Sequence, residues 1–355
     1  QCFPSRVGGI ESLVSNLAIN LGKDEKVIVF ADRHNVFYDA IFDNQNKSTI
    51  LVRRVGGIKF FRRRQKVKEI KLLIESQKIK LAIADSWKSL ELVIDYLNIK
   101  KITTISLAHG NELLPNNKYK SDRIKTTLNK VSAIVANSFF TKKLVENFLS
   151  SNILVNVVYP GATDLRNLKE TIIEDITGSP VLLTLARLEK RKGHEYIINS
   201  VKKILPQFPN IQYIIAGDGP EKKFLKTLVE KNHLNQNVKF VGMINDSQKK
   251  YLFSKTDLMI MPTLDERDKQ SIEGFGIAYL EAAFFGIPSI ASNIGGTPEA
   301  VLHKKTGIII DNINELHDTI NELLNDTKYL KNLGNQAKNR AINDFNWSKV
   351  SKKYL

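Results

Sequence analysis

The sequence predicts an α/β protein with two domains, each built on a doubly wound parallel sheet. Short β-branched segments alternate with longer amphipathic ones, a pattern typical of parallel strands joined by helical crossovers. This alternation runs through the chain twice, and a polar stretch at 161–180 without an obvious strand separates the two runs. The chain of 355 residues is also longer than one compact core supports.

The first run of strands predicts an N-terminal domain over residues 1–165. A paired-glycine turn, Gly8-Gly9-Ile10-Glu11, comes before all of its strand candidates. A turn of this kind normally follows a strand, so we expect the first strand of the domain to lie before Gln1 and to be missing from this sequence. The remaining candidate strands of this run are 27–30, 81–84, 102–107, 133–136 and 154–158.

The second run predicts a C-terminal domain over residues 166–340. We expect residues 341–355 to form a helix that packs back toward the N-terminal domain. In sheets of this type, ligands bind beyond the carboxyl ends of the strands, and two facing domains enclose a deep cleft. The candidate strands of this run are 181–185, 212–216, 238–241, 258–261, 288–291 and 307–310.

The charge of the chain is strongly basic and unevenly distributed. The net charge is +16, and residues 1–160 hold 26 Lys and Arg against 14 Asp and Glu. Within this half, the cluster Phe60 to Arg64 leads into a segment where Val67, Ile70 and Ile74 recur at helical spacing. This basic amphipathic helix is either a solvated face over a core stripe or a surface that docks on an anionic membrane. No nucleic-acid motif accompanies the charge, so no nucleic-acid partner is expected.

Cysteine content and hydropathy favour a cytoplasmic protein. The single cysteine, Cys2, excludes an internal disulfide and suits a reducing compartment. The sequence contains no apolar run near the roughly 18 residues that cross a bilayer, and no signal peptide pattern at its start.

Motifs at successive strand ends predict a ligand site. Arg187 and Lys192-Gly193 follow the strand 181–185, where two cations can meet a diphosphate. The motifs Gly217 to Pro220 and Gly295 to Glu299 close later strands. Each has a structural explanation as well: the first is a simple turn, and the second starts a helix with Thr297 as its N-cap. Their repetition is what favours a site.

Two glutamates lie eight residues apart in the segment Ser271 to Ala300. Glu273 precedes a Gly-Phe-Gly turn, and Glu281 lies inside the apolar helix predicted from Ile277 to Phe285. A carboxylate in such a helix is costly unless it accepts hydrogen bonds. Ribose hydroxyls are suitable donors, so the segment predicts a nucleotide site.

Together these motifs resemble the retaining, nucleotide-sugar-dependent glycosyltransferases of family 4, which have the two-domain GT-B fold with Rossmann-like domains. The glutamate pair with seven intervening residues is the hallmark of that family. The resemblance rests on Phe3-Pro4 with Gly8 to Glu11, His109 to Glu112, Arg187 with Lys192-Gly193, Gly217 to Pro220, Glu273 to Gly276 with Glu281, and Gly295 to Glu299.

The resemblance implies a role for each matching residue. Arg187 and Lys192 would bind the donor diphosphate and stabilise its growing charge as the glycosidic bond breaks. Glu281 would hold the ribose hydroxyls, and Glu273 the transferred sugar. The implied catalytic residues are His109, Arg187, Lys192 and Glu273, and the implied donor-binding residues are Gly9, Gly217, Phe275, Gly276, Ile277 and Glu281.

The chemistry implied is sugar transfer with retention, in which the leaving diphosphate accepts the proton of the acceptor. We expect neither a cofactor nor a metal ion, because no Asp-x-Asp motif stands in a suitable place. The charged segment Asp265 to Asp268 is interpreted as a polar loop. Where many members of the family have Pro-Asn-Gly-Val-Asp, this chain has Pro160-Gly161-Ala162-Thr163-Asp164, which leaves the contact made by that loop open.

The long loop Thr263 to Ser271 resembles members that transfer mannose from GDP-mannose to lipid acceptors. We therefore expect a lipid-linked or glycan acceptor, used in cell-envelope polysaccharide or glycolipid synthesis. A UDP-sugar donor is the alternative, and a UDP-sugar epimerase with the same fold is a further one. With Arg62, Arg63 and Arg64 as contacts, the basic half would attach the enzyme peripherally to the inner face of the cytoplasmic membrane.

Overall fold

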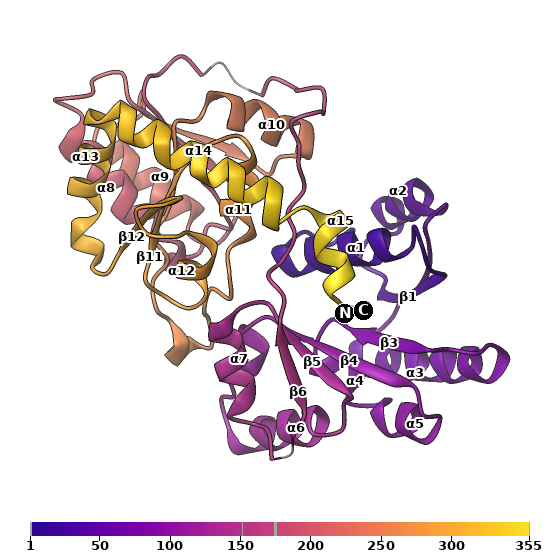
Figure 1. The fold of residues 1–355 in the computed structure, drawn as a ribbon. Helices are drawn as coiled ribbons and strands as arrows, with labels where there is room; N and C mark the ends of the chain where they lie inside the picture. Colours follow the sequence, from indigo (N-terminus) through magenta and orange to yellow (C-terminus); the bar gives the residue numbers. More distant parts are fainter. Residues whose placement is uncertain (1, 151, 174–175, 355) are drawn as a thin grey trace. The chain divides into compact units, whose positions relative to one another are not determined.

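The computed structural model describes residues 2–150, 152–173 and 176–354. It divides into two compact units (Figure 1). The N-terminal unit contains residues 1–161 and 347–355, and the C-terminal unit contains residues 162–346. Parallel strands alternate with helices in both units, which confirms the predicted α/β class.

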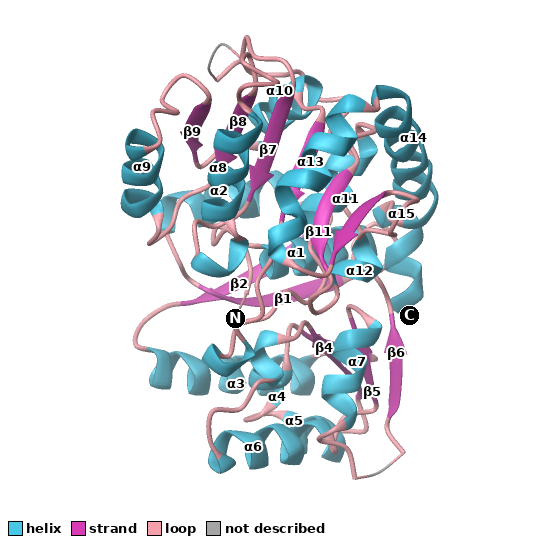
Figure 2. Ribbon diagram, turned by 90° about the vertical axis from the view of Figure 1, so that its left-hand side faces the viewer, coloured by secondary structure: helices cyan, strands magenta, loops and turns pink. Residues whose placement is uncertain are grey.

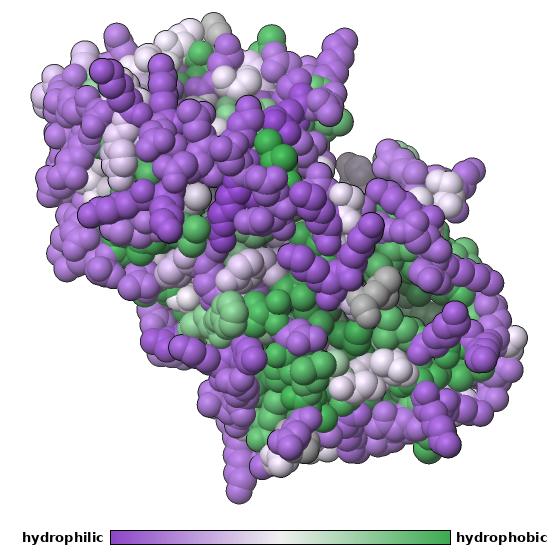
Figure 3. All heavy atoms as spheres, viewed as in Figure 1, coloured by the Kyte–Doolittle hydropathy of each residue, from purple (hydrophilic) through white to green (hydrophobic). Residues whose placement is uncertain are grey.

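The N-terminal unit contains two parallel sheets, one of two strands and one of four. The smaller sheet pairs β1 with β2, and the larger sheet has the order β3-β4-β5-β6. On the face drawn in Figure 3, apolar side chains gather over the region of the larger sheet. The strands are β1 (Val27–Asp32), β2 (Ile50–Val55), β3 (Leu81–Ala84), β4 (Thr103–Ala108), β5 (Ala133–Ala136) and β6 (Leu154–Val157).

Strand β2 was missed by the sequence analysis, because two arginines interrupt its apolar run. Its ends are buried at Ile50 and Val55. The side chain of Arg54 is 5% exposed, and its guanidinium contacts Asp39 at 3.1 Å and Asp43 at 2.8 Å. Paired in this way, the arginine lies inside the unit despite its charge.

The helices of the N-terminal unit pack on a core that includes Trp87, Ile124 and Ile134. The last segment of the chain belongs here, where α15 and η5 contact α1. The elements are α1 (Gly9–Leu21), α2 (Val36–Asn46), α3 (Lys59–Ser76), α4 (Trp87–Leu90), α5 (Ile94–Ile99), η1 (Asn111–Leu113), α6 (Lys118–Leu128), α7 (Phe139–Glu146), α15 (Trp347–Val350) and η5 (Ser351–Tyr354).

Helix α3 is the predicted basic helix, and its apolar stripe packs on the core of the unit. Two of its arginines are held in ion pairs: Arg62 contacts Asp32 at 3.0 Å, and Arg63 contacts Glu91 at 2.7 Å. The guanidinium groups of both arginines are therefore engaged within the unit, and the interpretation of these residues as membrane contacts stays a prediction. Arg64 is exposed and lies over the ring of Phe60.

The C-terminal unit contains one parallel sheet of six strands, with the order β12-β11-β10-β7-β8-β9. Figure 2 shows helices in front of and behind these strands. The strand order reverses between β7 and β10, which is the switch point of a doubly wound sheet. The strands are β7 (Val181–Leu185), β8 (Gln212–Ala216), β9 (Val238–Gly242), β10 (Leu258–Met261), β11 (Ser289–Ser292) and β12 (Gly307–Ile310).

The helices of this unit cover a core that includes Leu182, Ile197 and Ile290. Among the described residues, no helix is long and apolar enough to span a bilayer. The elements are η2 (Lys190–Lys192), α8 (His194–Ile204), α9 (Lys222–Lys231), α10 (Asp246–Lys255), η3 (Arg267–Lys269), α11 (Ile277–Phe284), α12 (Thr297–Ala300), η4 (Ile313–Glu315), α13 (Leu316–Asn325) and α14 (Thr327–Asp344).

Two local predictions at the start and end of helices are corrected by the structure. Thr297 is not the N-cap of α12; Gly296 is, and the buried Thr297 hydroxyl donates to backbone carbonyls that include Ile294 at 2.8 Å. Residues 341–344 continue α14, so the helix expected from residue 341 begins only at Trp347.

Helices α11 and α14 pack closely, and this contact supports the helix that carries Glu281. A Cβ atom added at Gly334 of α14 would lie 2.0 Å from the backbone oxygen of Gly286. The close approach therefore depends on the absence of a side chain at this position.

We predict that Gly334→Ala lowers the free energy of unfolding, although alanine is the better helix former by about 1 kcal/mol. The overlap with Gly286 should cost more than this gain, for a net loss of about 1 to 3 kcal/mol. The control is Asn335→Ala on the exposed side of α14, which should be neutral or slightly stabilising. Chemical denaturation of both variants checks this, and a stabilised Gly334→Ala would contradict it.

Candidate active site

The candidate site lies where the sheet of the C-terminal unit reverses its strand order. The loop after β7 and the loop after β10 meet there. The backbone nitrogen of Leu264 donates to the oxygen of Arg191 at 2.7 Å. A Cβ atom on Gly193 would lie 2.4 Å from the oxygen of Pro262. Side chains from both loops therefore converge outside the carboxyl ends of the two central strands, where ligands of such sheets bind.

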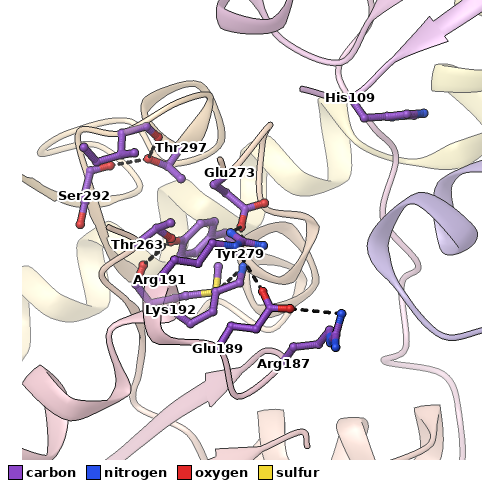
Figure 4. Close-up of polar contacts among 12 residues, drawn as sticks. His109, Arg187, Glu189, Arg191, Lys192, Thr263, Glu273, Tyr279, Ser292 and Thr297 are labelled. Carbon is purple, nitrogen blue, oxygen red and sulfur yellow. Dashed lines mark hydrogen bonds and ion pairs between the residues drawn. The ribbon is translucent and has the colours of Figure 1, made fainter. Parts of the chain in front are cut away.

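Glu273 lies at the centre of this convergence (Figure 4). Its Oε2 atom accepts hydrogen bonds from Arg191, at 3.1 Å, and from the ammonium group of Lys192. The three side chains are between 9% and 14% exposed. One carboxylate oxygen thus holds two partly desolvated cations.

The two cations keep Glu273 ionised. Burial works to raise the pKa of Glu273, but the charges of Lys192 and Arg191 outweigh it and lower the pKa to about 2. Burial lowers the pKa of Lys192, and the charge of Glu273 opposes that effect. The partly desolvated cations of the site are therefore paired with the carboxylate of Glu273.

The charge network continues from Glu273 toward the surface. Glu189 contacts Arg191 at 3.3 Å on one side and Arg187 at 3.1 Å on the other. Arg187 is 69% exposed, so its guanidinium reaches solvent at the edge of the site (Figure 4). The sequence analysis predicted Arg187 and Lys192 but missed Glu189 and Arg191. Both are charged residues that lie between Arg187 and Lys192 in the sequence, and this position could have indicated that they belong to the site.

Glycines at the strand ends hold these loops together. The nitrogen of Gly296 donates to the oxygen of Glu273 at 2.9 Å. Gly295 has a φ of +62°, and a Cβ atom there would lie 2.1 Å from the same oxygen. Gly217 allows a similar approach, because a Cβ atom added there would lie 1.9 Å from the oxygen of Ala186. Both motifs position the loops that carry the charged residues.

The turn after Glu273 starts helix α11. Gly276 has a φ of +99° and is the N-cap, with Ile277 as the first helical residue and no side chain as a cap. Phe275 is 2% exposed and packs edge-on against Phe345, so its ring is structural. The start of α11 therefore offers backbone N–H groups, which can donate hydrogen bonds to ligand oxygens.

Glu281 lies on α11 and is 7% exposed. Its Oε1 atom accepts a hydrogen bond from Lys249 of α10 at 2.9 Å, and Lys249 also contacts Asp246 at 3.1 Å. Burial acts to lower the pKa of Lys249, but the two carboxylates outweigh it and raise the pKa. Lys249 was not predicted from the sequence, because its distance along the chain from Glu281 gives no sign that α10 and α11 are neighbours.

The N-terminal unit contains the two remaining predicted site residues. His109 follows β4 and is 7% exposed, and its ring Nε2 lies 2.9 Å from the oxygen of Asp85. Because that oxygen can only accept, Nε2 carries a proton. The backbone nitrogen of His109 donates to Glu112 at 2.6 Å. Gly9 is the first residue of α1. The other eight predicted residues lie in the C-terminal unit.

Residues 169–340 match the family model described as glycosyl transferases group 1. A GDP-mannose-dependent phosphatidylinositol monomannoside mannosyltransferase of Mycobacterium tuberculosis is 28% identical over 176 residues, which are 49% of this chain and 46% of that protein. The chain thus spans about half the length of this relative. A monoacylated phosphatidylinositol monomannoside mannosyltransferase of Corynebacterium glutamicum is 25% identical, over 98% of this chain and 92% of that protein.

Solved structures share the fold over nearly the whole chain. The structure of Anabaena Alr3699/HepE in complex with UDP and glucose superposes with a TM-score of 0.80 and 22% identity, covering 99% of this chain and 96% of that one. Sucrose-phosphate synthase from Thermosynechococcus elongatus gives a TM-score of 0.78 and 19% identity, covering 98% and 92%. The predicted GT-B fold is confirmed.

The ion pairs of Glu273 predict a pH dependence of stability. The pKa of Glu273 is about 2 in the folded chain against an ordinary value of 4.5. A lowered pKa stabilises the fold above the unfolded value, and this contribution is lost as the pH falls toward the folded value. We predict that Glu273→Gln lowers the free energy of unfolding by about 3 kcal/mol at pH 7, because two cations lose their partner.

The difference between wild type and Glu273→Gln should stay constant above pH 5 and narrow from pH 4.5 toward pH 2. Denaturant titrations across this range measure it. Glu322→Gln, at an exposed position of α13, is the matched control and should show little difference at any pH. A gap that does not narrow in acid would refute the assignment of an ionised, cation-bound Glu273.

Proposed function

We propose that this chain, a group 1 glycosyltransferase with the GT-B fold, transfers a hexose with retention of configuration from a nucleotide sugar to an acceptor. The fold was predicted from the sequence and is confirmed by the solved structures. Group 1 membership is supported by the family model, which matches residues 169–340. The observation that carries the proposed reaction is the pair of desolvated cations, Lys192 and Arg191, on Glu273 at the switch point.

The first step in the proposed mechanism is an exchange of partners. The diphosphate of the donor would take Lys192 from Glu273 and recruit Arg187, which is already exposed. Glu273 would then accept hydrogen bonds from hydroxyls of the transferred sugar, while Arg191 keeps it ionised. Because charge grows on the diphosphate as it leaves, cations placed there act mainly in the transition state.

The second step is transfer on one face of the sugar. The bond between the anomeric carbon and the β-phosphate oxygen breaks, and the acceptor oxygen bonds to the same face of that carbon. The proton of the acceptor hydroxyl passes to the leaving phosphate oxygen, so no protein base takes part. Glu281 would hold the ribose, and Gly217 and the start of α11 from Phe275 to Ile277 would contact the donor. His109 and Gly9 would contribute from the N-terminal unit.

We propose that the reaction needs no metal ion. Lys192 and Arg187 would supply positive charge to the diphosphate, which is the task that a metal performs in other sugar transferases. No other cofactor is proposed.

The proposed donor is GDP-mannose. This choice is supported by the mannosyltransferase relatives, whose names specify that donor. A UDP-sugar is the second candidate, because Anabaena Alr3699/HepE has been solved with UDP and with UDP-glucose. The proposed acceptor is a lipid-linked or membrane-borne glycan in cell-envelope synthesis.

The proposed location is the inner face of the cytoplasmic membrane, with the N-terminal unit attached peripherally. At the start of α3, Ile58, Phe60 and Phe61 are 73%, 58% and 66% exposed, respectively. Arg64, Lys68 and Lys71 are exposed along the same helix. Aromatic side chains next to cations suit the headgroup layer of an anionic bilayer.

We predict that joint replacement of Arg187 and Lys192 by alanine lowers kcat at least about 100-fold, because transition-state charge loses its donors. The KM for the donor should rise less than this. The assay uses whichever GDP-, UDP- or ADP-sugar most stabilises the protein thermally, with a membrane lipid extract as acceptor. Turnover should be unchanged in excess EDTA.

The matched control is Lys190→Ala, an exposed cation of the same turn, which should retain activity. Thermal melts establish that the double variant is folded. Turnover of the double variant within a few-fold of wild type would remove both cations from the mechanism. Complete loss of wild-type activity in EDTA, restored by magnesium or manganese, would remove the proposal of metal independence.

We predict that the protein co-sediments with phosphatidylglycerol vesicles at low salt and is released as salt increases, since screening weakens surface attraction. Phe60→Ser/Phe61→Ser should weaken this binding at least about fivefold, because two rings lose their burial in the interface. Phe224→Ser, a 46% exposed position of α9, is the control. Equal recovery in the supernatant with anionic and neutral vesicles would disprove the membrane proposal.

A further inference from the structure

Glu281 is a buried carboxylate on a helix with little polar surface around it. Its neighbours on α11, Tyr279, Leu280 and Ala282, are all at most 1% exposed. An unpaired charge in such surroundings costs several kcal/mol, so the position requires a permanent partner. That partner comes from another helix: the Nζ atom of Lys249 on α10 lies 2.9 Å from Oε1 of Glu281.

Lys249 is itself held firmly in place. The start of α10 carries a capping box, in which the side chains of Asn245 and Gln248 each accept from the backbone nitrogen of the other at 3.0 Å. The ammonium group of Lys249 contacts Asp246 at 3.1 Å as well as Glu281. Lys249 is therefore fixed in position before any ligand arrives.

We propose that Lys249 is a positioning residue for the donor nucleotide and acts through Glu281. This proposal rests on the proposed function, in which Glu281 accepts hydrogen bonds from the ribose hydroxyls. Lys249 engages Oε1, and among the described residues the structure records no second partner for this carboxylate. The pair therefore fixes the carboxylate plane and directs Oε2 toward the ribose.

The positive charge of Lys249 has a second effect on a nucleoside diphosphate. A free carboxylate near a diphosphate would repel it, since the two anions would lie in a region of low dielectric constant. Paired with Lys249, Glu281 offers an acceptor oxygen to the hydroxyls while part of its negative charge is compensated, although Asp246 shares the same ammonium group. Lys249 thus allows an acidic residue to serve a site that binds an anion.

The proposal is tested by removing the ribose hydroxyls and Lys249 separately and together. The ligands are GDP and UDP, each with its 2′,3′-dideoxyribose form, and calorimetry gives the dissociation constants. Wild type should bind the ribose form at least about tenfold more tightly, because hydrogen bonds to a charged acceptor are lost in the dideoxy form. In Lys249→Met this preference for the ribose form should fall below about threefold, because the carboxylate of Glu281 is no longer held in place and its charge-assisted hydrogen bonds to the hydroxyls weaken.

Two controls separate positioning from folding. Lys249→Arg keeps the charge and should keep most of the preference for ribose. Lys255→Met removes an exposed cation from the same helix and should leave the preference at the wild-type value. If Lys249→Met does not fold, Lys249→Gln is the second variant, and the same loss of preference is expected.

Two results would overturn the proposal. Equal weakening of ribose and dideoxyribose binding in Lys249→Met would show that Lys249 only supports the fold. A wild-type protein that binds both forms equally would remove the ribose role of Glu281, and the proposal with it. Only this second result bears on the proposed function, so the two failures are distinguishable.

Discussion

The structure of the candidate site depends on the pairing of desolvated carboxylates with cations. Glu273 and Glu281 both lie in surroundings where a lone negative charge would be too costly to keep. Each is compensated by cations from a different element: Glu273 by Lys192 and Arg191 from the loop after β7, and Glu281 by Lys249 from α10. A ligand that binds these carboxylates or cations exchanges or shares their present partners.

The scaffold provides the pairs through its strand order and its glycines. Reversal of the order between β7 and β10 brings two loops distant in sequence to one edge of the sheet. Glycines without a Cβ atom, such as Gly295 against Glu273, then let neighbouring loops touch through their backbones. Backbone contacts therefore hold the loops together, and these contacts do not require the charged side chains.

The sequence predicted the parts of the protein that depend on local patterns. The strands of the C-terminal unit, helix α11 and the motif residues at the strand ends all follow from periodicity, glycine placement and family resemblance. The features that the sequence did not predict are ion pairs between elements. Arg54 pairs with Asp39 and so allows β2 to form, Arg62 and Arg63 pair with Asp32 and Glu91, and Lys249 pairs with Glu281. A single sequence gives the charge of a residue but not the partner that folding brings to it.

We propose that Lys192 exchanges Glu273 for the diphosphate of the donor, and a crystal structure of the protein with GDP or UDP tests this exchange. We expect a phosphate oxygen within about 3.2 Å of the Lys192 ammonium group, at hydrogen-bonding distance, with Arg191 still on Glu273. A nucleotide bound away from the carboxyl ends of β7 and β10, with Lys192 still paired to Glu273, would contradict it.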